Sequence, residues 1–234
     1  MTRNIIRTAG ALAVALGAVT LLATRGGASA ATMLPAPAFD DALATTKGGS
    51  MAVFSGGCFW GVQAVFQHVK GVTSAVSGYA GGEVSTANYD RVSDGNTGHA
   101  ESVRVTFDTS EVTYGQLLKI FFSVAHDPTQ LNFQGPDHGT QYRSEIWYTT
   151  PQQKTIAESY IAQLTKSKAF SAPIVTKLEP LSNFFPAEAY HQDYFTQHPN
   201  QPYIVYNDAP KVAALKKMMP ELWRDPPVLV GMAK

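Results

Sequence analysis

The sequence predicts a single-domain fold of the α+β class, and three observations support it. Short strand-like runs, some apolar and some alternating, are interspersed with longer runs that have the 3.6-residue periodicity of helices. The 234 residues, 44% apolar and 15% charged, have the composition of an ordinary globular domain with a sizeable core. No segment repeats along the chain. Elements in this order favour helices packed on a mixed sheet.

The first expected elements are a strand and a helix that meet at a pair of glycines. Residues 51–55, MAVFS, form a short apolar run that stops at Gly56 and Gly57. The apolar stripe of an amphipathic helix follows at positions i, i+3, i+4 and i+7: Val62, Val65, Phe66 and Val69. A chain reversal between the two elements is therefore expected at the glycines.

Two further strands are expected on either side of a polar loop. Residues 72–79 have a strand-like composition and end at the turn sequence AGG, residues 80–82. A polar loop covers residues 85–98. Residues 101–107, ESVRVTF, then alternate between polar and apolar positions, which predicts a strand with one buried face.

The second helix and a long aperiodic segment come next. Residues 113–125 begin with Thr113 and have Gln116 three positions later, which is the pattern of a capping box. Residues 126–144 show little periodicity. Irregular segments of this length inside a compact domain are usually functional, so this segment is a candidate part of a site.

The remaining elements complete a sheet with helices. A strand is expected at residues 145–149, and a helix follows it, capped by Thr150 with Pro151 at its first position. Further expected elements are a strand at 173–179, a short helix within 186–199 and a last helix at 210–219. The order predicts a mixed, largely antiparallel sheet packed by helices: a ferredoxin-like α/β plait core with an irregular C-terminal tail.

Residues 1–30 have the pattern of a secretory signal peptide. Two arginines give a basic start, residues 9–23 are almost wholly apolar, and Ala28, Ser29 and Ala30 form a small-residue cleavage site. We expect cleavage after Ala30 and export, to the periplasm of a bacterium. An uncleaved membrane anchor is the alternative. The apolar run is short for that role, because a membrane span needs about 20 residues.

The rest of the chain is predicted to form a linker and one domain. Residues 31–50 are rich in Ala, Pro, Thr and Gly and are expected to link the signal to a domain at 51–234. The chain has 18 basic and 18 acidic residues, so its net charge gives no indication of nucleic-acid binding.

Cys58 is the only cysteine of the chain, so no internal disulfide can form. An unpaired cysteine in an exported protein is either a buried, inert side chain or a reactive thiol. Cys58 falls where a strand ends and a helix begins. The free N–H groups and the dipole of a helix N-terminus favour an anion, which predicts a thiolate with a pKa below the usual value of about 8.5. The large rings of Phe59 and Trp60 follow directly and provide an apolar wall suited to a methyl group or thioether.

Several motifs of the chain resemble one family. GCFWG at Cys58 is similar to the active-site motif of the A-type peptide methionine sulfoxide reductases. The segments GYAGG at 78–82, residues 88–108, residues 126–144 and AEAYHQDY at 187–194 match that family in the same order. The resemblance covers about residues 51–220 and identifies the chain as a single-cysteine member.

The resemblance implies a reaction: reduction of methionine-S-sulfoxide, free or in oxidised proteins, as repair after oxidative stress. In that family the cysteine thiolate, here Cys58, attacks the sulfoxide sulfur. An acid must protonate the sulfoxide oxygen during the attack, and Glu101 in the motif GHAES matches it. The oxygen remains on the cysteine as a sulfenic acid.

The resemblance also implies a substrate-binding set. Tyr89 and Tyr142 match two phenols that hydrogen-bond the sulfoxide oxygen. Without the resemblance, each would be interpreted as a core aromatic whose hydroxyl bonds a backbone carbonyl. Asp137 matches an aspartate that binds the substrate's backbone amide, and on its own it is a turn residue after a proline. Phe59 and Trp60 match the methyl-binding wall.

The chain departs from many members of the family in having no second cysteine. Ile204 and Val205 stand where a resolving thiol would be expected, and Gln63 stands where a glutamate is frequent. An outside thiol reductant, such as thioredoxin or a thioredoxin-like protein, is therefore expected to reduce the sulfenic acid. The resemblance implies no cofactor and no metal, the six histidines lack ligand spacing, and we expect a monomer.

Two other functions remain open on the residues alone. His99 or His191 could activate Cys58 in a Cys–His thiol hydrolase or acyltransferase. A secreted, non-catalytic binding protein with an aromatic pocket is the other. His191 and Asp193 lie in a motif that matches the reductase family, where we assign them a structural role.

Overall fold

The computed structural model describes residues 31–232, so the expected signal peptide lies outside the described residues. The main sheet has the strand order β7-β6-β1-β3-β2-β8, in which every pair is antiparallel except β6 with β7. Its strands are β1 (Gly49–Gly56), β2 (Val72–Ala80), β3 (Ala100–Asp108), β6 (Ser144–Tyr148), β7 (Lys177–Pro180) and β8 (Phe184–Pro186). A hairpin of β4 (Phe133–Gln134) and β5 (Asp137–His138) stands apart from it.

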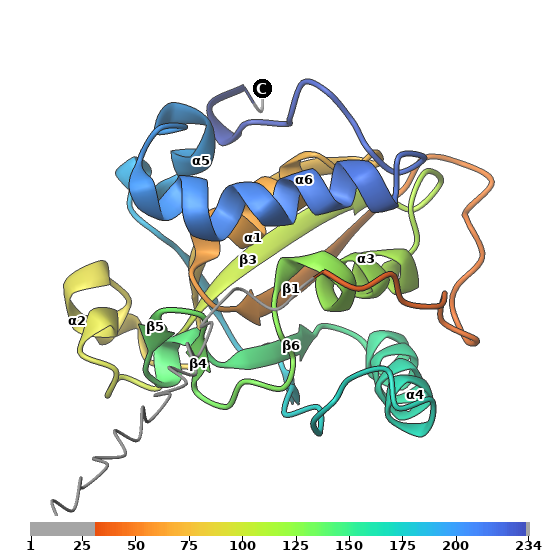
Figure 1. The fold of residues 1–234 in the computed structure, drawn as a ribbon, viewed down its shortest axis with the longest axis horizontal. Coiled ribbons are helices and arrows are strands. Elements are labelled where there is room, and N and C mark those ends of the chain that lie inside the picture. Colours follow the sequence, from red (N-terminus) through yellow and green to blue (C-terminus); the bar gives the residue numbers. More distant parts are fainter. Residues whose placement is uncertain (1–30, 233–234) are drawn as a thin grey trace, which may run out of the picture.

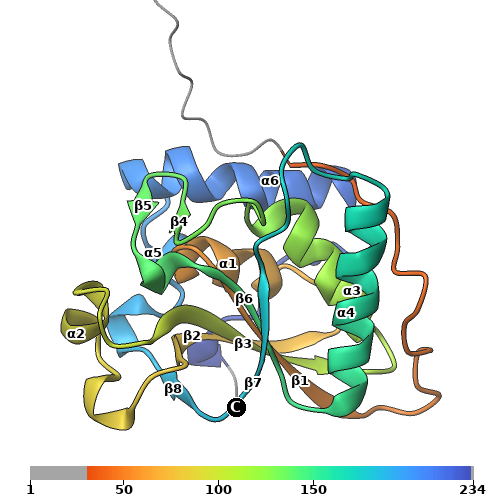
Figure 2. The same ribbon diagram turned by 90° about the horizontal axis from the view of Figure 1, so that it is seen from below.

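The helices cover the sheet unevenly. They are α1 (Phe59–Gln67), α2 (Tyr89–Ser93), α3 (Tyr114–Ile120), α4 (Pro151–Lys166), α5 (Tyr194–Gln197) and α6 (Ala209–Met218). Short 3₁₀ segments lie at Val84–Thr86, Thr140–Tyr142, Ala189–His191 and Val230–Met232, and π turns at Phe121–Ala125 and Ile204–Asp208. Helices α1, α3 and α6 lie on one side of the sheet (Figure 2), and α6 crosses over α1 (Figure 1). No helix among the described residues is long and apolar enough to cross a bilayer.

The predicted α+β plait is confirmed. The order β1-α1-β2-β3-α3-β6 along the chain gives the spatial order β6-β1-β3-β2, which is the split βαβ arrangement of a ferredoxin-like core. The predicted capping box of α3 is present, with Thr113 and Gln116 bonded reciprocally, and Thr150 caps α4 as expected. The apolar face of β3 is buried at Val103 and Val105.

Helix α1 differs from the prediction because it is buried nearly all round rather than on one stripe. Its polar side chains are therefore paired inside the protein. Gln63 donates to the Ala75 carbonyl and to Gln192 Oε1, and accepts from the Asp193 N–H. Gln67 donates to Asp193 Oδ1. A glutamate at position 63 would lack these donors, which gives a physical reason for an amide here.

Four other differences separate the structure from the prediction. The expected polar loop at 85–98 contains α2, and the aperiodic segment 126–144 contains the β4–β5 hairpin. Residues 186–199 do not form one helix, because Asp193 has a left-handed φ of +57° that separates a 3₁₀ turn from α5. The short strand β8 was not predicted and exists through pairing with the edge of β2.

The segment 31–50 lies along the domain surface rather than standing free. Leu34 is 3% exposed and belongs to the main core, and the Tyr160 hydroxyl donates to the Pro35 carbonyl. Asp40 binds the start of α3, accepting from Thr113 Oγ1 at 2.5 Å and from the Gly115 N–H at 2.9 Å. This carboxylate therefore acts as a helix cap supplied from 73 residues away in the sequence.

Replacing Asp40 by alanine should lower the free energy of unfolding by about 1–2 kcal/mol, because it removes two hydrogen bonds at a helix N-terminus. Urea unfolding followed by far-ultraviolet circular dichroism measures this. Asp41→Ala is the matched control, since the Asp41 side chain meets only the exposed Gln152 amide. Equal effects of the two substitutions would contradict a specific capping role.

Candidate active site

Cys58 lies at the N-cap of α1, immediately after the turn that ends β1. Gly57 has a φ of +89°, and a Cβ there would lie 2.5 Å from Gln134 Cγ, so both its conformation and the close approach require glycine. The Cys58 side chain is 8% exposed and is a free thiol. The predicted strand-to-helix junction is present, and it holds a buried thiol.

The N-terminus of α1 brings together a carboxyl and a thiol. The Phe59 N–H donates to Glu101 Oε2 at 3.0 Å, and Cys58 is the N-cap residue, where the backbone N–H of Trp60 lowers the pKa of the thiol. Thiol and carboxyl therefore share one helix N-terminus, although they are 43 positions apart. Strand β3, which lies beside β1, delivers the carboxyl to this position.

The pKa of the Cys58 thiol is raised well above its usual value, contrary to the expectation from helix position alone. Burial is the largest cause, and the nearby carboxyls of Glu101 and Asp208 add to it. The Trp60 N–H acts in the opposite direction but is outweighed. The thiol therefore holds its proton at neutral pH.

Burial raises the pKa of Glu101 to about 8, partly offset by the hydrogen bond from the Phe59 N–H. The carboxyls of Asp137 and Asp208 raise this pKa further. Glu101 is 3% exposed. A carboxyl in these surroundings is protonated at pH 7 and can act as an acid.

A cavity of about 280 Å³ opens above the thiol. All seven residues predicted for the site line it, together with Gln201 and Tyr203, which the sequence analysis missed. The predicted residues are Cys58, Phe59, Trp60, Tyr89, Glu101, Asp137 and Tyr142. They come from α1, α2, β3, β5 and the 3₁₀ turn at Thr140–Tyr142, so five separate segments converge on one recess.

Aromatic contacts hold one wall of this cavity. The Trp60 ring stacks on Tyr194 with centroids 3.8 Å apart and meets Tyr203 edge-on at 5.9 Å. Its Nε1–H donates to Nδ1 of His191 at 3.1 Å. The Phe59 ring is fully buried and packs against His191 at 5.0 Å. His191 thus orients the two rings of the wall, which agrees with the structural role assigned to it.

Tyr89 and Tyr142 are both half-buried at the cavity, and burial is the largest cause of the raised pKa of each phenol. Both therefore remain hydrogen-bond donors over the neutral range. The position of Tyr89 is fixed by Glu188, whose Oε1 accepts from the Tyr89 N–H at 2.9 Å.

Tyr203 hydrogen-bonds Oδ2 of Asp137 and so fixes that carboxyl at the cavity edge. Burial raises the pKa of Asp137. The signal that could have indicated Tyr203 is its place directly before Ile204, the position where a resolving thiol would be expected. Asp208, also missed, is fully buried near Cys58 and has no distinguishing sequence signal.

The two histidines considered for a thiol hydrolase, His99 and His191, each engage a ring nitrogen with another group. His99 Nε2 lies 3.0 Å from the Glu83 carbonyl oxygen, and Nδ1 of His191 accepts from Trp60. No histidine is among the described residues that line the 280 Å³ cavity. The arrangement therefore does not favour Cys–His acyl-transfer chemistry.

Comparisons with known proteins agree on one family. Residues 50–222 match the family described as peptide methionine sulfoxide reductase. The chain is 63% identical over 183 residues to peptide methionine sulfoxide reductase MsrA 2 of Mesorhizobium japonicum, covering 78% of this chain and 94% of the relative. It is 49% identical over 187 residues to the protein of the same name from Synechocystis sp., covering 79% and 87%.

Two solved structures are similar in fold as well as in sequence. The reduced form of Mxr1 from Saccharomyces cerevisiae has a TM-score of 0.59 at 31% identity, covering 68% of this chain and 94% of that one. Methionine sulfoxide reductase A of Corynebacterium diphtheriae has a TM-score of 0.57 at 33% identity, covering 67% and 78%.

Proposed function

Because the chain belongs to the peptide methionine sulfoxide reductase family, we propose that the cavity above Cys58 is where it reduces methionine-S-sulfoxide. The protein is a peptide-methionine (S)-S-oxide reductase, an oxidoreductase of protein repair that acts on oxidised proteins and free methionine sulfoxide. The observation that best supports this proposal is that Cys58 and Glu101 meet at the N-terminus of α1. Cys58 is its N-cap residue, and Glu101 accepts a hydrogen bond from its first N–H group.

Cys58 is the nucleophile and Glu101 the acid. A sulfoxide sulfur is a poor electrophile while its oxygen carries negative charge, so the protonated Glu101 carboxyl donates toward that oxygen as the Cys58 sulfur attacks. The oxygen is transferred to Cys58, the methionine thioether leaves, and the thiol proton ends on the transferred oxygen. Cys58 is then a sulfenic acid and the substrate sulfur has been reduced by two electrons.

The other cavity residues hold the substrate. The phenols of Tyr89 and Tyr142 hydrogen-bond the sulfoxide oxygen, which positions it for the acid. Phe59 and Trp60 pack against the methyl group beside the sulfur. Asp137, fixed by Tyr203, accepts from the backbone N–H of the oxidised residue.

An outside thiol must reduce the sulfenic acid, because Cys58 is the only cysteine of the chain. Thioredoxin or a thioredoxin-like protein is the proposed reductant, and no bound cofactor is needed for either step. The composition of residues 1–30 supports export with cleavage after Ala30, in a bacterium to the periplasm. Mass spectrometry of the protein isolated from a periplasmic extract tests that cleavage.

The function is tested by assaying the R and S sulfoxides separately with dithiothreitol as reductant. We expect reduction of the S epimer alone. After one equivalent of the S sulfoxide without reductant, mass spectrometry should find one added oxygen on Cys58. Activity on neither epimer, or an added oxygen elsewhere, would overturn the assignment of the site.

A further inference from the structure

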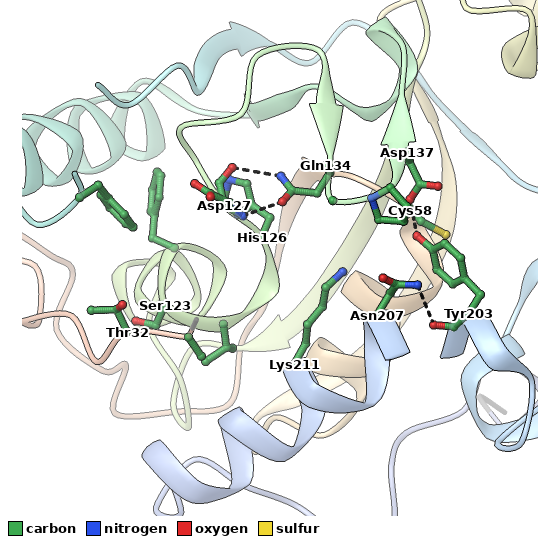
Figure 3. Close-up of a pocket in the computed structure, with 16 residues that line it drawn as sticks. Thr32, Cys58, Ser123, His126, Asp127, Gln134, Asp137, Tyr203, Asn207 and Lys211 are labelled. Atoms are coloured by element: carbon green, nitrogen blue, oxygen red, sulfur yellow. Dashed lines mark hydrogen bonds between the residues drawn. The ribbon is translucent and has the colours of Figure 1, made fainter. Parts of the chain in front are cut away.

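One edge of the 280 Å³ cavity is polar, and the turn that leads into helix α6 builds it. Gln201 and Tyr203 line the cavity two positions apart, at the start of that turn. The Tyr203 hydroxyl hydrogen-bonds Oδ2 of Asp137 beside Cys58, and the Tyr203 carbonyl accepts from Asn207 Nδ2 at 3.2 Å (Figure 3). One turn therefore fixes Asp137 and brings Gln201 to the same cavity.

The two side chains of this edge have opposite hydrogen-bonding capacity. Gln201 Oε1 accepts from the Ile204 N–H at 3.0 Å, and among the described residues its Nε2 meets no acceptor. Asp137 Oδ2 accepts from Tyr203, and its Oδ1 meets no donor among the same residues. The edge thus offers two amide donors from one side chain and a carboxylate oxygen from the other. A peptide backbone presents the complementary pair, an N–H and a carbonyl oxygen.

The lining of this cavity has no positive charge. None of its nine described residues is a lysine, an arginine or a histidine. Lys211 lines a separate, narrow cavity of about 40 Å³, and its ammonium group is hydrogen-bonded to Asp208 Oδ1 at 3.3 Å. A free amino acid has a carboxylate where a residue within a chain has a neutral carbonyl. That carboxylate would face the charge of Asp137 with no cation in the lining to offset it.

We propose that Asp137 and Gln201 together recognise the backbone of the oxidised residue, and that Gln201 selects peptide-bound over free methionine sulfoxide. This inference rests on the proposed reaction at Cys58. Asp137 accepts from the backbone N–H, and Gln201 donates to the carbonyl oxygen of the same residue. The free amino acid remains a substrate, with a lower kcat/KM than the residue in a peptide.

The position of the oxidised residue in its chain therefore affects its repair. A methionine sulfoxide inside a chain, or at its N-terminus, keeps the neutral carbonyl that Gln201 binds. At an N-terminus the ammonium group also suits the charge of Asp137. A methionine sulfoxide at a C-terminus carries the carboxylate instead, so we expect it to be repaired more slowly.

The test uses three small substrates of S configuration at sulfur, with dithiothreitol as reductant. N-acetyl-methionine sulfoxide N-methylamide has both backbone groups, N-acetyl-methionine sulfoxide has the carboxylate, and N-acetyl-3-(methylsulfinyl)propylamine lacks the carbonyl. Their kcat/KM values report the steps up to oxygen transfer to Cys58, which is the first half-reaction. In wild type we expect the amide to exceed the other two by about fivefold, the effect of one neutral hydrogen bond.

Two substitutions of Gln201 isolate its donors. Gln201→Glu keeps an acceptor for the Ile204 N–H and has no N–H to donate, and Gln201→Leu removes the donors without adding charge. Both should lower kcat/KM for the amide about fivefold, to the value of the carbonyl-free substrate, and leave that substrate within twofold of wild type. Asn200→Asp is the matched control, because it adds the same charge at the exposed neighbouring position, and it should keep the preference.

The outcomes separate recognition from other effects. Equal kcat/KM for the amide and the carbonyl-free substrate in wild type would overturn the proposal. Equal losses on both substrates in the Gln201 variants would also overturn it, because they would indicate a disturbed turn. Loss of the preference in Asn200→Asp would assign it to charge alone and contradict the hydrogen bond. If wild type reduces none of the three substrates, the proposed function itself is wrong.

Discussion

Replacing Cys58 by serine should reduce the rate of methionine sulfoxide reduction by roughly four orders of magnitude or more, to the background of the reductant alone. A serine hydroxyl neither attacks the sulfoxide sulfur nor carries the transferred oxygen as a sulfenic acid. The measurement is methionine formation from the S sulfoxide by chromatography. No other cysteine of the chain can take over, since Cys58 is the only one.

The serine variant should still fold. The substitution exchanges one small side chain for another at an N-cap, a position where serine is favoured. Near-ultraviolet circular dichroism and the midpoint of thermal unfolding provide this control. Residual turnover above about one hundredth of wild type in a folded variant would mean that Cys58 is not the nucleophile.

Replacing Glu101 by glutamine should lower the rate of the first half-reaction by about 10²- to 10⁴-fold, because the amide occupies the same space but has no acidic proton to give. Single-turnover methionine release is the appropriate measurement, since it does not depend on the titration of a reductant. Glu111→Gln, on an exposed glutamate beyond the end of β3, is the matched control and should not change the rate. A loss in the Glu101 variant below tenfold would contradict the role as acid.

The pH profile carries a second signature of Glu101. An acid must be protonated to act, so the single-turnover rate should be level below the pKa of Glu101 and fall as pH rises through about 8. In Glu101→Gln this fall should disappear while the remaining activity stays low. A fall near pH 8 that persists in the variant would assign that titration to another group.

The sequence was sufficient to predict the elements that depend on residues close together along the chain. The capping box of Thr113 with Gln116 and the alternation along β3 depend on neighbours a few residues apart, and both were predicted. Cys58 was singled out for the same reason, because it sits where a glycine turn meets an apolar helical stripe. The resemblance to a family singled out Glu101 and the other candidate residues, and the structure brings them to one cavity with Cys58.

What the sequence did not indicate depends on distant segments. Tyr203 and Asp208 reach the site because the π turn at Ile204–Asp208 and the helix α6 after it pack on α1, and no spacing along the chain encodes that contact. Strand β8 exists only through its pairing with β2. The pKa of Cys58 was expected to fall and is raised, because burial and the three carboxyls of Glu101, Asp208 and Asp137 outweigh the helix N-terminus.

The burial of α1 also bears on which damaged proteins can be repaired. The helix that carries Cys58 is enclosed on nearly all sides, and the thiol lies 8% exposed at the floor of a recess. A thiol held in this way does not move outward to meet an oxidised methionine, so the protein under repair must bring its own side chain inward. Sulfoxides on mobile loops and chain ends should be repaired first, whereas one held within an intact helix must wait until its surroundings unfold.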